Sequence, residues 1–194
     1  MTFRFLPDTH EYFLGERRLE SVTEILGASG IADYRFSNEG ATTRGRYVHT
    51  ATEMIDRGTL DWEILDGTLR PYCEAYRHFI EDKRPEILLS EKPMYHPTLL
   101  FAGTPDRVMR MDDTIILPDL KSGAPTRATA VQVSAYRELV AVSEGIICRK
   151  LFSLHLKNNG KYQLSEPINT MDAKRLFNIF LAALTVERFK KEAV

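Results

Sequence analysis

The chain contains 194 residues, 43% of them hydrophobic and 27% charged, so it is long enough for one domain with a hydrophobic core and belongs to the ordinary globular class. Its 26 basic and 27 acidic residues nearly cancel, which excludes a protein-wide attraction to nucleic acid and makes any site for a polyanion a local one. Two cysteines, Cys73 and Cys148, are too few for a disulfide framework or a four-thiolate metal site within the chain. No apolar run approaches the roughly 18 residues of a membrane-spanning helix and the N-terminus lacks a signal- or transit-peptide pattern, so we expect a cytoplasmic protein.

The N-terminal residues are predicted to form short strands followed by a short helix. Apolar and polar residues alternate around HEYFLGERRLESV, and Gly15 and Glu16 are suited to a turn. This pattern predicts strands over residues 3–6, 10–14 and 17–20. Ser21 and Glu24 have the spacing of a capping box, which predicts a helix that stops at Gly30.

Two amphipathic helices are predicted next, after a loop over residues 31–40. One runs from Thr42 to about Arg57 and is ended by Gly58. The other covers residues 69–83 and cannot continue through Pro85.

From residue 86 the hydrophobic period changes. We expect three strands, over residues 86–95, 99–110 and 114–121, followed by a helix over 127–143. Two strands over 147–156 and 161–166 and a closing helix over 171–191 complete the chain. The order of helix, three strands, helix and strand indicates an α/β fold with a mixed sheet flanked by helices. The whole chain, 1–194, is expected to be a single domain, divided into an N-terminal hairpin and helices (1–85), a sheet core (86–166) and a C-terminal helix (167–194).

Two aspartates lie in strand-like sequence, although carboxylates are poor strand residues and costly to bury alone. If Asp112 and Asp113 form a two-residue turn, the register places Asp106 opposite Asp119, with their Cβ atoms about 4.5 to 5.5 Å apart. Side-chain alternation then directs Lys121 to the same face as Asp119. A divalent ion such as Mg²⁺ or Mn²⁺ would explain the paired acids. The alternative is that both aspartates cap strand ends in solvent, beside prolines that interrupt pairing.

Five motifs in a fixed order carry a family resemblance. GTPD at 103–106, PDLK at 118–121 and QVSAY at 132–136 resemble the signature of the PD-(D/E)XK nuclease superfamily, in its RecB-like exonuclease branch. SVTEIL at 21–26 and RGRYVHTATE at 44–53 are similar to N-terminal motifs of phage-type exonucleases related to the mitochondrial genome maintenance exonuclease. The resemblance implies a restriction-endonuclease-like α-β-β-β-α-β core, here with an N-terminal hairpin and helical elaboration.

The resemblance also implies roles for individual residues. Asp106 and Asp119 would bind the metal, the backbone carbonyl of Leu120 would complete the protein ligands, and Lys121 would be the catalytic lysine. His49 matches a helical histidine that contacts a metal in this branch. Relatives with an iron–sulfur cluster hold it with four cysteines, so we expect no such cluster here.

Further site candidates each have an ordinary structural alternative. Glu53 lies one turn from His49 and could steady it or reach a metal-bound water, and Glu91 could be a further acid of the site or a solvated strand residue. Gln132 and Tyr136 share a helix face and could position substrate, or could simply pack against the helix's neighbours.

Basic and aromatic residues near the motifs are candidates for contacts with DNA. Phosphate contacts are predicted for four arginines that are individually also explained as surface charges: Arg44, Arg46, Arg107 and Arg127. Stacking on unpaired bases is predicted for three aromatic residues, of which at least one is expected in the core: Tyr34, Phe36 and Tyr47.

The expected function is hydrolysis of DNA phosphodiesters by a Mg²⁺- or Mn²⁺-dependent exonuclease, in phage or bacterial recombination, repair or replication. Expected partners are DNA and a single-strand annealing or replication protein. Two alternatives stay open: a structure-specific or restriction-type endonuclease, and a catalytically silent nucleic-acid-binding protein of the same fold.

Overall fold

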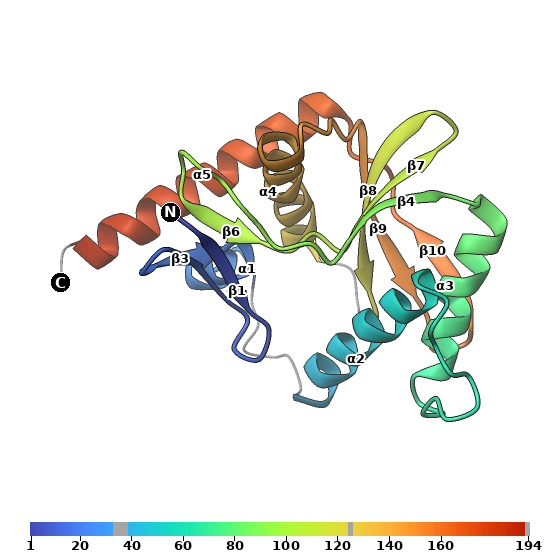
Figure 1. Ribbon diagram of the computed structural model, residues 1–194. Helices are drawn as coiled ribbons and strands as arrows, with labels where there is room; N and C mark the ends of the chain where they lie inside the picture. Colours follow the sequence, from blue (N-terminus) through green and yellow to red (C-terminus); the bar gives the residue numbers. More distant parts are fainter. Residues whose placement is uncertain (33–38, 124–125, 193–194) are drawn as a thin grey trace.

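Two five-stranded sheets and five helices organise the computed structural model, which describes residues 1–32, 39–123 and 126–192 (Figure 1). The strands are β1 (Phe3–Leu6), β2 (Glu11–Leu14), β3 (Arg17–Ser21), β4 (Glu86–Ser90), β5 (Met94–Tyr95), β6 (Phe101–Gly103), β7 (Arg107–Met111), β8 (Thr114–Lys121), β9 (Lys150–Leu156) and β10 (Tyr162–Leu164). The helices are α1 (Val22–Ala28), α2 (Glu39–Asp56), α3 (Arg70–Lys83), α4 (Arg127–Glu144) and α5 (Thr170–Glu192). Within these residues no helix is long and apolar enough to cross a membrane.

The second sheet has the order β10-β9-β8-β7-β4 and contains the predicted core. Strands β8 and β9 are parallel and are joined through α4, whereas the other neighbours are antiparallel. This is the expected geometry, because parallel neighbours need a long crossover, commonly a helix. Read along the chain, α3, β4, β7, β8, α4 and β9 give the order α-β-β-β-α-β, so the predicted fold class is confirmed.

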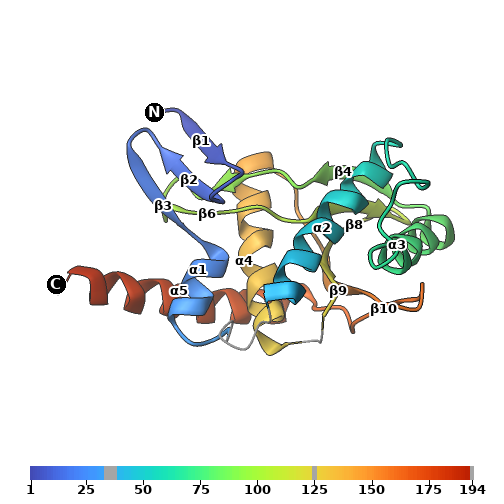
Figure 2. The ribbon, with the colours of Figure 1, turned by 90° about the horizontal axis from the view of Figure 1, so that it is seen from below.

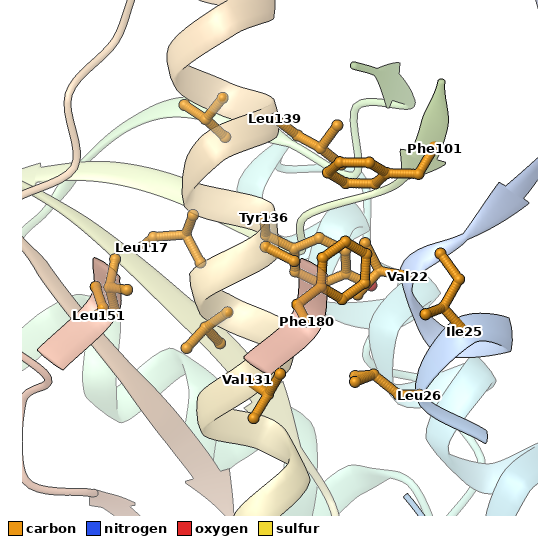
Figure 3. Packing of buried hydrophobic residues seen from close by; sticks show 14 of the residues in the cluster. Val22, Ile25, Leu26, Phe101, Leu117, Val131, Tyr136, Leu139, Leu151 and Phe180 are labelled. Atoms are coloured by element: carbon orange, nitrogen blue, oxygen red, sulfur yellow. The ribbon is translucent and has the colours of Figure 1, made fainter. Parts of the chain in front are cut away.

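Helices cover both faces of this sheet, and alternation along β8 decides which side chain meets which helix. Leu117 packs with Leu151 and Val131 on the α4 side (Figure 3), whereas Ile116 and Leu120 belong to the cluster formed with α2 and α3. Figures 1 and 2 show α4 and α5 on one side of the sheet and α2 and α3 on the other. Odd-numbered residues at the end of β8 therefore point toward α4.

The first sheet has the order β1-β2-β3-β6-β5, and it corrects the predicted strands over 86–95 and 99–110. Each predicted strand is broken into two, and the pieces β5 and β6 pair in the first sheet rather than the second. The breaks have local causes. Glu91 has φ 45° and donates its N–H to the carbonyl of Asp106 at 2.9 Å, while Pro93 and Pro105 interrupt strand pairing.

The helix boundaries follow the predicted signals closely. The Ser21 hydroxyl accepts from the Glu24 N–H at 3.1 Å and the Glu24 carboxylate accepts from the Ser21 N–H at 2.8 Å, so the capping box is confirmed. Helix α2 begins at Glu39, three residues before the predicted start, and Gly58 follows its end with φ 66°.

Candidate active site

The turn between β7 and β8 has the predicted register. Asp112 and Asp113 have φ angles of 45° and 58°, the left-handed conformation that a tight two-residue hairpin turn requires. Met111 pairs with Thr114, as predicted from the sequence.

Backbone pairing of these strands ends before the two aspartates. In this register Pro118 would face Arg107, and a proline has no N–H to donate. Asp106 precedes β7 and reaches β8 with its side chain instead, where Oδ2 accepts a hydrogen bond of 2.6 Å from the N–H of Leu120. The predicted direct pairing of Asp106 with Asp119 is thus not a ladder pair, although both carboxylates lie at the same end of β8.

Asp119 is a buried carboxylate whose charged partner is Lys121. Its exposed fraction is 1%, and its oxygens accept no hydrogen bond from any other described residue. Lys121 Nζ lies 2.7 Å from Oδ2 as an ion pair. Burial raises the pKa of Asp119 to about 6; Lys121 opposes this rise and Asp106, itself 7% exposed, adds to it. The alternative in which both aspartates cap strand ends in solvent is therefore wrong.

His49 reaches this region from α2. Its Nδ1 lies 3.2 Å from Glu91 Oε1 and 3.4 Å from Asp106 Oδ1, and its Nε2 lies 3.2 Å from the carbonyl oxygen of Leu120. Burial lowers the pKa of His49, but the Asp106 and Glu91 carboxylates outweigh it and raise the pKa to about 9. An imidazolium consequently donates on both sides and supplies positive charge between the carboxylates.

Gln132 and Tyr136 lie on the α4 face that meets this end of β8. Gln132 Oε1 accepts from Lys121 Nζ at 3.4 Å, and Gln132 Nε2 donates to the Tyr136 hydroxyl at 3.2 Å. The Tyr136 ring packs tightly against Gly103, where an added Cβ would lie 2.7 Å from Cε1. The glycine of the GTPD motif thus leaves room for the tyrosine of QVSAY.

Of the two predicted accessory acids, Glu91 contacts His49 and Glu53 pairs elsewhere. Glu53 forms an ion pair of 2.7 Å with Arg57, one turn further along α2, and the predicted contact with His49 is not among its contacts. Glu91, from the break after β4, contacts His49 instead. Helix periodicity favours the i+4 neighbour of a residue, but here a residue from another element lies closer.

Arg107 is not available to DNA, which corrects its predicted role as a phosphate contact. Its side chain is completely buried, with an ion pair of 2.5 Å to Asp56 and one of 3.0 Å to Glu91. Alternation along β7 explains this position, because Arg107 shares a face with Met109, which packs in the cluster formed with α2 and α3. Asp56 itself was not recognised from the sequence.

The other predicted DNA contacts differ in exposure. Arg46 and Arg127 are exposed, whereas Arg44 is half-buried with its guanidinium 5.6 Å from the centre of the Tyr72 ring. Tyr47 is 58% exposed, as a stacking residue would be. Two of the predicted stacking residues lie outside the described residues: Tyr34 and Phe36.

The donor set fits a hard divalent cation. His49, Glu91 and Asp106 each offer a ligand atom, and these atoms lie within 4.8 Å of one another. The carbonyl oxygen of Leu120 lies 3.2 Å from His49 Nε2. Asp119 is not in this set of three, although the charges of Asp106 and His49 act on its carboxylate. Carboxylate and carbonyl oxygens with one imidazole are ligands that suit Mg²⁺ or Mn²⁺.

The fold is shared with a solved bacterial structure. A protein from Eubacterium rectale named "Putative exonuclease" superposes with a TM-score of 0.53 at 10% sequence identity, over 87% of this chain and 82% of that one. At this identity the similarity shows the fold alone, and it agrees with the core described above.

A second solved structure is less similar to this chain. An alkaline exonuclease from Laribacter hongkongensis is 16% identical over 86% of this chain and 91% of its own, with a TM-score of 0.36 that is too low to show a common fold. No protein-family model and no curated protein matches the sequence.

Proposed function

We propose that this protein is a metal-dependent deoxyribonuclease that hydrolyses phosphodiester bonds, with Mg²⁺ or Mn²⁺ as the ion and exonucleolytic cleavage as the mode. The observation that carries the proposal is the meeting of Asp106, Asp119, Lys121 and His49 at one end of β8, with the Asp119 carboxylate buried beside the Lys121 ammonium. The fold shared with a protein named as an exonuclease supports it, as does the order of the sequence motifs.

Four groups would hold the ion: the carboxylates of Asp106 and Asp119, the carbonyl of Leu120 and the imidazole of His49. When bound, the ion would polarise the scissile phosphate and lower the pKa of a water molecule. Because His49 is protonated in the metal-free protein, it must lose a proton before it can be a ligand. Glu91 could then orient the ring through its contact with Nδ1.

Lys121 is the candidate catalytic lysine. Its ammonium would donate hydrogen bonds to the phosphate oxygens or to the attacking water and would offset the negative charge of the transition state. Gln132 accepts from Lys121 Nζ and Tyr136 supports Gln132, so the two α4 residues would orient the ammonium. The family resemblance implies products with 5′-phosphate and 3′-hydroxyl ends.

DNA would approach past exposed residues near the site. Arg46 lies one turn before His49 on α2, and Arg127 begins α4. Both are exposed and would contact phosphates without a large basic surface, which is compatible with a net charge of −1. We infer from the resemblance a role in phage or bacterial recombination, repair or replication, beside a single-strand annealing or replication protein.

The test is digestion of end-labelled single- and double-stranded DNA, and of closed circular DNA, with Mg²⁺, Mn²⁺ or EDTA. We expect metal-dependent cleavage of linear DNA that Asp119→Ala and Lys121→Ala abolish, while both variants keep the wild-type circular-dichroism spectrum. Glu81→Ala and Lys150→Ala are matched controls, because both side chains are exposed and outside the site.

Three results would decide against parts of the proposal. Full activity of Lys121→Ala would remove the assigned chemistry. Cleavage of circular DNA would favour an endonuclease. Gel retardation of DNA without cleavage under any metal condition would favour a silent binding protein.

A further inference from the structure

Arg107 is a fully buried cation directly behind the candidate metal site. It follows Asp106 in the chain and, like Met109 two residues later in β7, points toward α2 and α3. Burying an arginine is costly unless its charge is compensated and its N–H groups are bonded. A sequence that keeps an arginine at such a position must therefore provide a complete set of partners.

All three nitrogens of the guanidinium donate hydrogen bonds. Nε donates to Asp56 Oδ2 at 2.5 Å, and Nη2 donates to Thr52 Oγ1 at 3.2 Å. Nη1 donates to Glu91 Oε1 at 3.0 Å and to the carbonyl oxygen of Asp106 at 2.6 Å. The four acceptors come from α2, from the break after β4 and from the residue before β7, so one planar group joins three separate segments.

Three of these acceptors contact a candidate metal ligand or belong to one. Glu91 Oε1 is also 3.2 Å from His49 Nδ1, so Arg107 and His49 share one carboxylate oxygen. The Thr52 hydroxyl donates to the carbonyl of His49 at 2.9 Å. The third acceptor is the backbone of Asp106 itself. Arg107 therefore constrains both His49 and Asp106 through single intervening contacts, without touching the place where a metal would bind.

Asp56 completes this arrangement from the far side. Its Oδ2 pairs with Arg107 Nε, and its Oδ1 accepts from the Tyr76 hydroxyl at 2.7 Å. The guanidinium carbon lies 5.7 Å from the centre of the Tyr76 ring. Without the Asp56 charge, the buried guanidinium would draw the Glu91 carboxylate toward itself and away from His49.

We propose that Arg107 is a positioning residue that fixes Glu91, His49 and Asp106 in the geometry for binding a divalent ion, and that Asp56 holds Arg107 in place. This inference rests on the proposed function, because it assigns Arg107 a role toward the same ion. The rigid planar fork of an arginine suits the task, since a lysine has one nitrogen and cannot reach four acceptors in different directions.

The test measures Mn²⁺ binding to the metal-free, full-length protein by isothermal titration calorimetry. Arg107→Met keeps the length of the side chain. Asp56→Asn is isosteric, and besides Arg107 the Asp56 carboxylate accepts only from the hydroxyls of Tyr76 and Ser90 among the described residues. We expect both to weaken Mn²⁺ affinity by about tenfold to a hundredfold, as loss of outer contacts to metal ligands commonly does. Arg110→Met is the matched control, because Arg110 lies on the same strand, is exposed and pairs only with Glu86 among the described acidic residues. The Mn²⁺ affinity of this variant should equal that of the wild type.

A second measurement separates positioning from DNA contact. DNA affinity in EDTA, measured against salt concentration, should be the same for Arg107→Met and the wild type, because a buried group releases no counterions. A salt slope lower by about one with unchanged Mn²⁺ affinity would overturn the inference in favour of a phosphate contact.

The remaining outcomes are distinguishable. If Arg107→Met does not fold, Asp56→Asn carries the comparison alone. Wild-type Mn²⁺ affinity in the folded variants, with only a lower melting temperature, would mean that Arg107 is merely structural and would overturn the inference. Absence of Mn²⁺ binding by the wild type would instead refute the metal-dependent function from which the inference starts.

Discussion

Gly103→Ala is the substitution whose effect the structure specifies most closely. An alanine Cβ at this buried position would lie 2.7 Å and 3.3 Å from Cε1 and Cδ1 of Tyr136, and 3.2 Å from Cδ1 of Leu139. Gly103 is not among the glycines with positive φ, so the backbone itself accepts alanine, and the closest contact that opposes it is the one with Tyr136, followed by that with Leu139. The tyrosine ring belongs to a packed core and cannot move without displacing neighbours (Figure 3).

Overpacking of this kind costs about 1–3 kcal/mol, and the lower entropy of the unfolded alanine variant offsets about 0.4–1 kcal/mol. For a chain of this size the net loss, up to about 2.6 kcal/mol, corresponds to a decrease in melting temperature of up to about 10 °C. A shifted Tyr136 also withdraws support from Gln132 and hence from Lys121. If the proposed chemistry is right, DNA cleavage should fall by about 10- to 100-fold, because small displacements of catalytic groups have effects of that size.

Chemical denaturation of four proteins tests the cause: wild type, Gly103→Ala, Tyr136→Ala and the double variant. The two substitutions should be strongly coupled, with Gly103→Ala close to neutral once the ring is absent. Gly45→Ala in α2 is the matched control. Its nearest neighbour is Ser122 Oγ at 3.7 Å, and it should stabilise the protein by about 0.5–1 kcal/mol as a helical glycine replaced by alanine. Equal destabilisation by Gly103→Ala with and without the Tyr136 ring would refute the reasoning.

Three further predictions concern stability and reactivity. Asp119→Asn should leave the melting temperature of the metal-free protein unchanged or raise it at pH 8, because burial disfavours the carboxylate charge and raises its pKa to about 6 in spite of the ion pair with Lys121. The same substitution should abolish the rise in melting temperature that Mn²⁺ gives the wild type, and a lower metal-free value would contradict the reasoning. Asp113→Gly should stabilise the hairpin by up to about 1 kcal/mol in urea denaturation, since φ is 58°, and destabilisation would count against the turn geometry. Burial raises the pKa of Cys73 to about 11 and that of Cys148 to about 12. Neither thiol should therefore react with Ellman's reagent at pH 8 until the protein unfolds, and rapid reaction in native buffer would exclude the buried positions.

The hairpin and the capping box were predictable because their interactions are local. A two-residue turn fixes the pairing of Met111 with Thr114, and side-chain alternation then carries Asp119 and Lys121 to one face. The same alternation rule, applied along β7, places Arg107 on the face of Met109 and would have excluded it from the DNA-facing side. That signal was present in the sequence, and the prediction of a phosphate contact did not use it.

The broken strands show where local signals were insufficient. Pro93 and Pro105 mark interruptions, but a proline does not say which sheet the next strand will join. That choice depends on β3, far earlier in the chain, which offers β6 a parallel edge. Asp106 lies where the chain returns to the second sheet, which is why its side chain, rather than its backbone, meets β8.

The sequence by itself determined the order of elements, the hairpin register and which residue types could share a site, because each follows from spacing within a few residues. The tertiary structure alone decided that His49 contacts the carbonyl of Leu120, 71 residues away, and that Arg107 pairs with Asp56, 51 residues away. Such contacts arise from how α2 packs against the sheet, and hydrophobic periodicity fixes the face of a helix but not the partner that it meets.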